Sequence, residues 1–218
     1  MPRTGRPPRT SRAQIMSAAR TLIDRDGWEK LTMRRLAVET GTAPTTLYHH
    51  VRDKEDLLLQ LLEYYAAEIP RPELPSDPRE RIIAAATVMH DALAGWPWVV
   101  EVLTGDDLVS ESALWMVEQI LAGVVDSGRT PDEAVHVYRS IWYYTAGEIM
   151  IRARSARRRA EGRPNYRDSV LLKQTDLPTV AAVADRWPEL SSRDTYRQGL
   201  RALVDGLLQP QQNGLSHG

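Results

Sequence analysis

The 218-residue sequence predicts an all-α fold in two helical domains. Apolar residues recur at the three- and four-residue spacing of one helix face along almost the whole chain, whereas the alternating pattern of strands is scarce. Proline occurs four times between residues 70 and 78, which is typical of a linker between domains. Capping residues, helix-starting prolines and terminal glycines then mark where individual helices begin and end.

The first domain is expected to span residues 9–69. Its first helix follows Ser11 and is closed by a glycine, and a short second helix is capped by Thr32. A glycine turn then allows a third helix over residues 44–50, which starts on a proline whose missing N–H costs nothing there. Asp53 caps a fourth helix with a leucine stripe.

The second, larger domain is expected to span residues 77–208, followed by a disordered tail at 209–218. A proline after an acidic cap starts its first helix, and a threonine, proline and two acidic residues start its longest one. The helical patterns in this domain cover, in order, residues 78–94, 112–125, 131–155, 178–186 and 193–208.

Composition excludes several classes of protein. The chain has no cysteine, which rules out thiolate chemistry, cysteine-based zinc sites and a disulfide scaffold. Residues 1–12 carry arginine but no apolar stretch, so they do not resemble a secretory signal. The most apolar long stretch, Val135 to Ile151, is interrupted by Arg139 and Glu148, so no membrane span is expected. We therefore expect a cytoplasmic protein without a membrane partner.

Charge is distributed unevenly although the net charge is −1. Residues 1–60 carry eleven basic and seven acidic side chains, a balance of +4, and the remainder carries −5. This asymmetry is expected if only the N-terminal domain contacts nucleic acid. Residues 1–8 are predicted to form a flexible basic arm. The arginines expected to track a DNA groove or backbone are Arg3, Arg6, Arg9 and Arg12; a solvated charged terminus is the equally weighted alternative.

The short helices within residues 32–51 match a helix-turn-helix, the arrangement that lays its second helix in the major groove of DNA. The second of these helices has Leu47 and Val51 on one side, which would anchor it to a core. Threonine hydroxyls and methyls and histidine nitrogens can read base edges. The side that would face DNA carries Pro44, Thr45, Thr46, His49 and His50.

Phosphate groups need cations and hydrogen-bond donors around that helix. The side chains of this kind within a turn or two of it are Thr32, Arg34, Arg35, Tyr48 and Lys54. For any single residue, ordinary surface polarity remains the alternative explanation, but it is a much weaker explanation of the whole motif.

The pattern resembles the TetR family of bacterial regulators. Asp26-Gly27 ends the first helix, and LTMRRLAVETGTAPTTLYHHVRDKEDLL follows with the family's order of capping, turn and core residues. Val51 stands where many members have phenylalanine, as in the branch closest to tetracycline repressors. The resemblance implies a three-helix DNA-binding domain with base contacts from Thr45, Thr46 and His49. It also implies phosphate contacts from Thr32, Arg34, Tyr48, His50 and Lys54.

One helix-turn-helix reads only a few base pairs, so a symmetric homodimer on a palindromic operator is expected. The helix from Pro131 is apolar nearly all round and must be covered on several sides. The resemblance implies that the helices near 131–155 and 193–208 of two subunits form a four-helix bundle. It also implies repression, and nucleoid association of the DNA-bound protein.

The second domain concentrates aromatic and polarizable side chains while phenylalanine is absent. Tryptophan and tyrosine suit the wall of a ligand cavity, although a plain core is equally compatible with them. We expect an apolar or aromatic small-molecule effector that favours a dimer geometry unable to bind DNA. The residues predicted to contact it are Met89, His90, Trp96, Trp98, Trp115, Met116, Tyr138, Trp142, Tyr143 and Glu148.

Two alternatives come from other functional classes. An enzyme is not supported, because the chain has no glycine-rich phosphate loop, HExxH motif or GxSxG elbow. His49 and His50 would point about 100° apart on a helix, so they could not both bind one metal ion. No metal site, cofactor or catalytic residue is predicted. A protein-interaction module built on the arginines of Arg152–Arg163 is the second alternative, against a merely solvated helix end.

Overall fold

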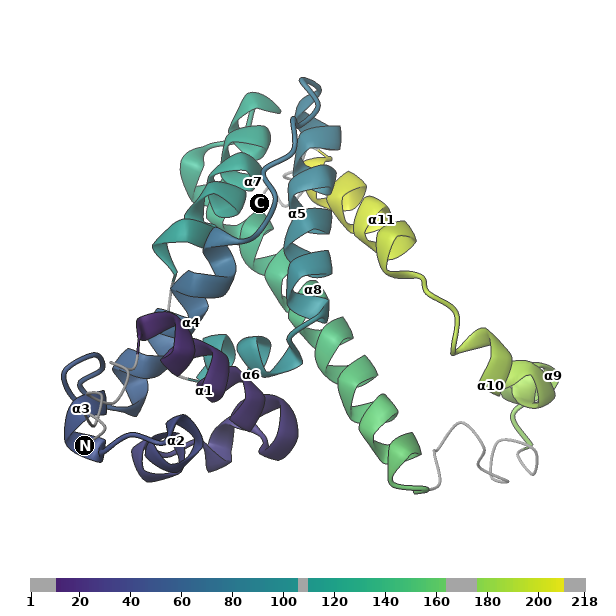
Figure 1. The fold of residues 1–218 in the computed structure, drawn as a ribbon. Coiled ribbons are helices and arrows are strands. Elements are labelled where there is room, and N and C mark those ends of the chain that lie inside the picture. Colours follow the sequence, from purple (N-terminus) through teal and green to yellow (C-terminus); the bar gives the residue numbers. More distant parts are fainter. Residues whose placement is uncertain (1–10, 106–109, 164–175, 210–218) are drawn as a thin grey trace, which may run out of the picture. The chain divides into compact units, whose positions relative to one another are not determined.

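The computed structural model describes residues 11–105, 110–163 and 176–209, and these are helical with no strand among them (Figure 1). The all-α prediction is confirmed. The elements of the N-terminal part are α1 (Arg12–Asp26), η1 (Trp28–Lys30), α2 (Met33–Thr40), α3 (Pro44–Leu47) and α4 (Lys54–Ala67). They are followed by α5 (Pro78–Ala94), α6 (Pro97–Gly105), η2 (Glu111–Ala113), α7 (Leu114–Asp126), α8 (Pro131–Ala160), α9 (Pro178–Val183), η5 (Ala184–Arg186), α10 (Trp187–Leu190) and α11 (Tyr196–Leu208).

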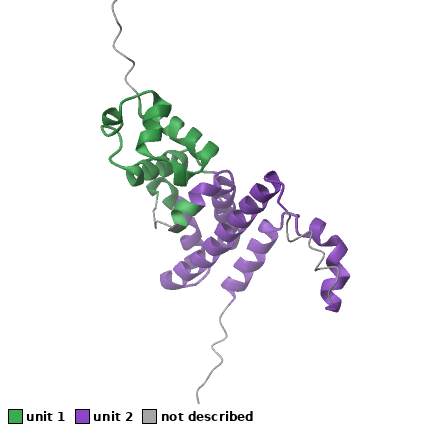
Figure 2. Cartoon of the chain, turned by 90° about the horizontal axis from the view of Figure 1, so that it is seen from below, with its two compact units in different colours: residues 1–71, 101–114 green, residues 72–100, 115–218 purple. Residues whose placement is uncertain are grey.

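The chain divides into two compact units (Figure 2). The first unit contains residues 1–71 and 101–114, and the second contains 72–100 and 115–218. The sequence did not indicate that 101–114 would join the first unit. Helix α6 therefore begins in the second unit and ends in the first.

Capping residues start the helices of the first unit where the sequence predicts. Ser11 forms a capping box with Gln14, and the side chains of Thr32 and Asp53 accept hydrogen bonds from the first turns of α2 and α4. Gly41 ends α2 in the left-handed region at φ 62°, which favours glycine and permits the tight turn. Around this frame, the fully buried apolar side chains include Ile15, Ala19, Leu36, Leu47, Leu57 and Leu61.

Several helix boundaries differ from the prediction, including the start of α7 at Leu114 and the end of α9 at Val183. Helix α3 ends at Leu47 instead of His50, because tight bonds from His49 N to Thr46 O (3.3 Å) and from His50 N to Leu47 O (2.8 Å) turn the chain. Helix α8 continues past residue 155 to Ala160, since arginine favours helices and suits their C-terminal end. Helix α11 starts at Tyr196, three residues later than expected. The predicted arm at 1–8 and the tail beyond 209 lie outside the described residues.

Helices α5, α7, α8 and α11 build the core of the second unit. A Cβ atom on Gly123 of α7 would come within 2.6 Å of Ile82 Cγ1 and 2.9 Å of Pro78 O, so glycine lets α7 approach α5 closely. Gly199 of α11 likewise lies against the ring of Tyr144 on α8. No helix in the described part of the chain is both long and apolar enough to cross a membrane.

Candidate nucleic-acid interface

The first unit presents α3 on a buried anchor. Leu47 is 0% exposed and Val51 1% exposed, so both face the core as predicted. Four side chains on the outer side of this segment, Pro44, Thr45, His49 and His50, are exposed, and Thr46 is half-buried. A helix of four residues is too short to be stable alone, so this core contact holds its outer face in place.

The polar side chains on this outer face are available for new partners. Within the described residues, no hydrogen bond joins the side chains of Thr45, Thr46, His49 or His50 to another group. The Tyr48 side chain is 54% exposed and lies beside them. These hydroxyl and imidazole groups can donate to or accept from base edges or phosphates without breaking an internal contact.

The two neighbouring arginines of α2 differ in availability. Arg35 donates to Lys30 O (3.1 Å) and pairs with Asp26, so it ties α2 to the end of α1. The exposed Arg34 has no ion pair among the described residues. Arg34 instead faces an open hollow of about 380 Å³, whose walls are Leu22, Arg25, Arg34, Arg35, Val38 and Glu39. Of the two, only Arg34 is free to bind a phosphate.

Lys54, the first residue of α4, lies in a defined contact. Its ammonium nitrogen donates to Glu29 O at 3.2 Å and lies 5.0 Å from the ring centroid of Trp28. The indole nitrogen of Trp28 in turn donates to Glu101 Oε2 at 2.7 Å. Sequence inspection missed Trp28 and Glu101, because nothing in the sequence brings α6 beside η1.

Glu63 of α4 fastens the second piece of this unit. Its carboxylate accepts hydrogen bonds from Ser110 Oγ at 2.7 Å, from Ser112 N at 3.2 Å and from the Ser112 hydroxyl. Donation by Ser112, and then by Ser110, lowers the pKa of the Glu63 carboxyl. These bonds explain why the residues after α6 join the first unit.

The residues predicted to contact an effector all lie in the second unit, but the extent to which their side chains are buried differs. Met89, Trp98 and Met116 are buried, as core side chains are. Tyr143 lies outside: it is 57% exposed, and its hydroxyl accepts from Arg139. The half-buried members of the set are His90, Trp96, Trp115, Tyr138, Trp142 and Glu148.

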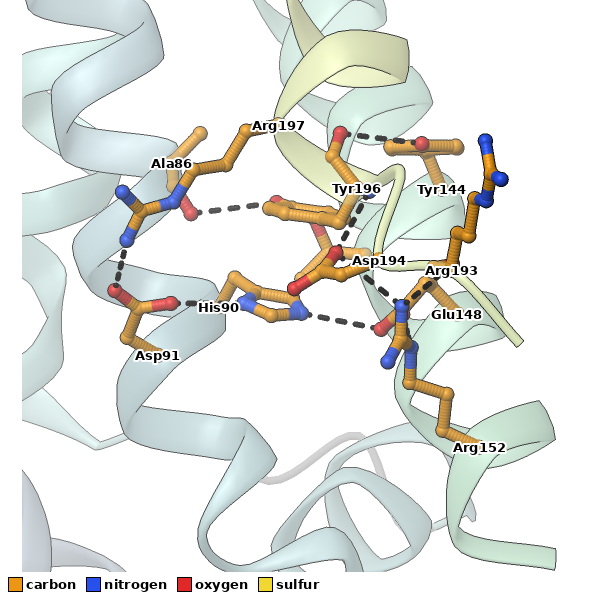
Figure 3. A network of polar contacts seen from close by, with 11 residues as sticks. Ala86, His90, Asp91, Tyr144, Glu148, Arg152, Arg193, Asp194, Tyr196 and Arg197 are labelled. Atoms are coloured by element: carbon orange, nitrogen blue, oxygen red, sulfur yellow. Dashed lines mark hydrogen bonds and ion pairs between the residues drawn. The ribbon is translucent and has the colours of Figure 1, made fainter. Parts of the chain in front are cut away.

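The structure brings two of these residues together, His90 and Glu148 (Figure 3). The ring nitrogens of His90 lie 3.0 Å from Asp91 Oδ1 and 3.1 Å from Glu148 Oε2. The imidazole stacks on the ring of Tyr196, with 3.7 Å between centroids. The Tyr196 hydroxyl pairs with Thr145 Oγ1 at 2.8 Å, and burial raises the pKa of this phenol.

The His90 cluster consists of His90, Asp91, Thr145, Glu148 and Tyr196. Arginines form ion pairs with the two carboxylates on its outer side. Arg152 pairs with Glu148, and Arg197 lies 3.0 Å from Asp91 Oδ2. His90 and Glu148, two of the polar side chains predicted to contact an effector, are therefore already partnered within the unit. The sequence did not indicate the polar role of Tyr196, since the partners of its hydroxyl are more than fifty residues away. Among the described residues, no group of three His, Asp or Glu is arranged to hold a metal ion.

The first unit has the features of a helix-turn-helix DNA-binding protein: a capped three-helix frame, a left-handed glycine turn and an outward row of unpaired polar groups. Comparison with known proteins agrees. The family model for bacterial regulatory proteins of the tetR family matches residues 15–61. The model for the tetracyclin repressor-like C-terminal domain matches residues 71–210. The chain belongs to the TetR family.

Individual relatives extend over most of the chain. It is 28% identical to the HTH-type transcriptional repressor DrrR1 of Streptomyces coeruleorubidus, covering 94% of this chain and 80% of the relative. It is 25% identical to the class A tetracycline repressor protein from transposon 1721 of Escherichia coli, covering 88% of both. The fold matches that of Mycobacterium smegmatis BioQ with a TM-score of 0.69, at 23% identity over 91% of this chain and 97% of BioQ. The protein is thus a DNA-binding transcription regulator and not an enzyme.

Proposed function

We propose that this protein is a homodimeric, cytoplasmic repressor that binds a palindromic operator and is released from it by a small-molecule effector. The observation that carries the proposal is the outer face of α3, where exposed polar side chains without internal partners stand on buried Leu47 and Val51. A surface of this kind has little to bury and several groups to offer a DNA groove. The bound form is associated with the nucleoid.

Two sets of residues divide the DNA contacts in this proposal. Thr45, Thr46 and His49 read base edges, and Pro44 supplies an apolar contact at the start of α3. The second set binds phosphates: Thr32, Arg34, Tyr48, His50 and Lys54. The Thr32 hydroxyl accepts from Arg35 N as a cap, which leaves its own proton for a phosphate oxygen.

The dimer is proposed to form through α8 and α11, in the regions 131–155 and 193–208. Large apolar side chains stay exposed along α8 in the single chain: Val135 at 46%, Tyr143 at 57% and Ile151 at 60%. Covering them with a second copy would bury this apolar surface and give the two-fold dimer that a palindrome requires. Analytical ultracentrifugation tests this, with Tyr143→Glu expected to shift the protein toward monomer while Glu118→Gln leaves the dimer intact.

The effector is proposed to be apolar or aromatic and to bind in the second unit near the tryptophans and tyrosines of α5 to α8. Helix α6 supports this route, because residues 97–100 belong to the second unit and 101–105 to the first. A ligand that favours one arrangement of α6 changes DNA affinity by its preference for that state. Ligand titration followed by tryptophan fluorescence, with DNA release measured in parallel, tests the mechanism. Ligand binding without DNA release contradicts it.

Selection of bound DNA from a random pool at fixed salt tests the function itself. The wild-type chain is expected to enrich a palindromic sequence, and the combined change of Thr45, Thr46 and His49 to alanine is expected to abolish that enrichment. Glu118→Gln, at an exposed position of α7 outside both proposed interfaces, serves as the control and should enrich the same sequence. A wild-type protein that enriches no sequence overturns the proposed function.

A further inference from the structure

We propose that Trp28 is a positioning residue for Lys54, and that its bond to Glu101 makes the end of α6 set the phosphate contact of that lysine. The inference rests on the proposed function, in which Lys54 binds a DNA phosphate. It goes beyond that function by naming the two residues through which a change in α6 reaches the DNA surface.

The position of the Lys54 ammonium is determined by two contacts from η1. The nitrogen donates to Glu29 O at 3.2 Å, and it lies over the Trp28 ring at 5.0 Å from the centroid. An ammonium has three N–H donors, and the ring attracts the charge through its π face. One donor is used by Glu29, so donors remain for a phosphate.

Holding Lys54 in this way increases its value as a phosphate contact. A free lysine side chain samples many rotamers, and this freedom is lost when the ammonium binds a phosphate. The Trp28 ring limits that freedom before DNA arrives.

Glu101 holds the ring at the correct angle. The indole N–H of Trp28 donates to Glu101 Oε2 at 2.7 Å, a charge-assisted bond that fixes the ring edge. A carboxylate at the ring edge also adds negative potential beneath the cation. Glu101 belongs to α6, so any rotation of this helix that breaks the bond releases the ring and, with it, Lys54.

Local backbone geometry explains why Trp28 is available for this role. Gly27 has φ 89° and ψ 149°, a conformation that favours glycine, and it directs the three-residue η1 away from α1. Trp28 is consequently half-buried and not packed into the core formed by α1 and α4. A tryptophan placed only to fill the core would have no need of a lysine on its face and a carboxylate at its edge.

The test is a double-mutant cycle on DNA binding, measured as affinity against salt concentration with the selected operator. Lys54→Ala is expected to reduce the slope of log affinity against log salt by about 0.9, the value for one phosphate contact. Trp28→Leu is expected to weaken binding about two- to fivefold, the range of an exposed cation–π contact, and to shift the slope toward that of Lys54→Ala. In the Lys54→Ala background, Trp28→Leu should have no further effect.

Trp28→Phe and Glu101→Ala isolate the indole bond. Each is expected to give a smaller loss than Trp28→Leu, and the two together should lose no more than either alone. Thermal unfolding is measured for every variant to show that it folds. If Trp28→Leu does not fold, Trp28→Phe, which keeps an aromatic ring, replaces it in the cycle. Lys30→Ala is the matched control, since this exposed lysine has no side-chain partner among the described residues. In the Lys30→Ala background, Trp28→Leu should weaken DNA binding as much as it does in the wild type.

Two results overturn the inference. One is an equal loss from Trp28→Leu in the wild-type and Lys54→Ala backgrounds, which would mean that Trp28 acts through folding. The other is wild-type affinity and slope in Trp28→Leu. Failure of the proposed function gives a different result: wild-type protein then selects no operator, while Trp28 and Lys54 variants bind random DNA like the wild type.

Discussion

The outer face of α3 and the His90 cluster are built from similar residues, but their polar groups are satisfied in opposite ways. The side chains of Thr45 on α3 and of Tyr48 and His49 directly after it lie exposed, with no side-chain hydrogen bond among the described residues. In the second unit, His90, Thr145 and Tyr196 bond to one another or to neighbouring carboxylates. Histidine, threonine and tyrosine side chains are therefore without internal partners in one unit and bonded within the unit in the other.

Residue type alone therefore does not identify a binding site. An exposed polar group loses little by exchanging water for DNA, whereas a buried one must give up a partner before it can bind a ligand. Changes to the exposed side chains on the outer face of α3 should alter DNA binding without altering stability. Changes in the His90 cluster should do the reverse.

The largest effect is expected from Tyr196→Ala. This side chain is 1% exposed, and its truncation leaves a cavity and an unpaired Thr145 hydroxyl, which together cost about 3–5 kcal/mol of unfolding free energy. Urea denaturation measures the loss. Tyr48→Ala, at a 54% exposed position, should change stability by less than about 0.5 kcal/mol and weaken DNA binding instead. A larger stability loss at Tyr48 than at Tyr196 would contradict the comparison.

His49→Ala should weaken operator binding by about 1–3 kcal/mol, the usual range for a lost base contact, while the unfolding midpoint stays unchanged. Electrophoretic mobility or fluorescence anisotropy measures the affinity. The control is His136→Ala, an exposed histidine of α8 in the second unit. Equal weakening of DNA binding by both substitutions would show that His49 makes no specific contact with the operator.

Glu63→Gln should reduce the acid sensitivity of the protein. Because serine donors lower the folded-state pKa of Glu63, its ionised form stabilises the fold above the usual glutamate pKa of 4.5. That contribution is lost as pH falls through the lowered folded-state pKa. Thermal unfolding midpoints between pH 7 and pH 3 should therefore fall more steeply for the wild type than for Glu63→Gln. Glu118→Gln, an exposed position on α7, should follow the wild type.

The smallest effect is expected at the arginine-rich end of α8. Arg157 is 83% exposed and pairs with Glu161 at 3.1 Å, so Arg157→Ala should change stability by no more than about 0.5 kcal/mol. DNA affinity should not change either. If repression in cells is lost while DNA binding in vitro is intact, the protein-interaction hypothesis for this stretch gains support.

Local signals account for what the sequence could predict. The caps at Ser11, Thr32 and Asp53 and the turn at Gly41 act within four residues, so the helices that position α3 could be placed from the sequence. Burial of Leu47 and Val51 followed from their spacing.

Contacts between distant segments could not be predicted. Trp28 and Glu101 are 73 residues apart, and His90 and Glu148 are 58 apart, so no spacing rule relates them. For the same reason, the sequence could not separate the paired histidine at 90 from the unpaired one at 49. The proposed base and phosphate contacts, the dimer and the effector site remain predictions for the experiments above.

Because α3 is only four residues long, repression of the target gene should depend on temperature. Four residues cannot hold a helical shape without Leu47 in its buried position, so the face proposed to read DNA exists only while the first unit is folded. Operator occupancy therefore depends on the thermal stability of this small unit. A strain carrying a volume-conserving core substitution such as Leu47→Met, which costs less than about 1.5 kcal/mol, should repress normally in the cold and lose repression on warming, which would make temperature a second input beside the proposed effector.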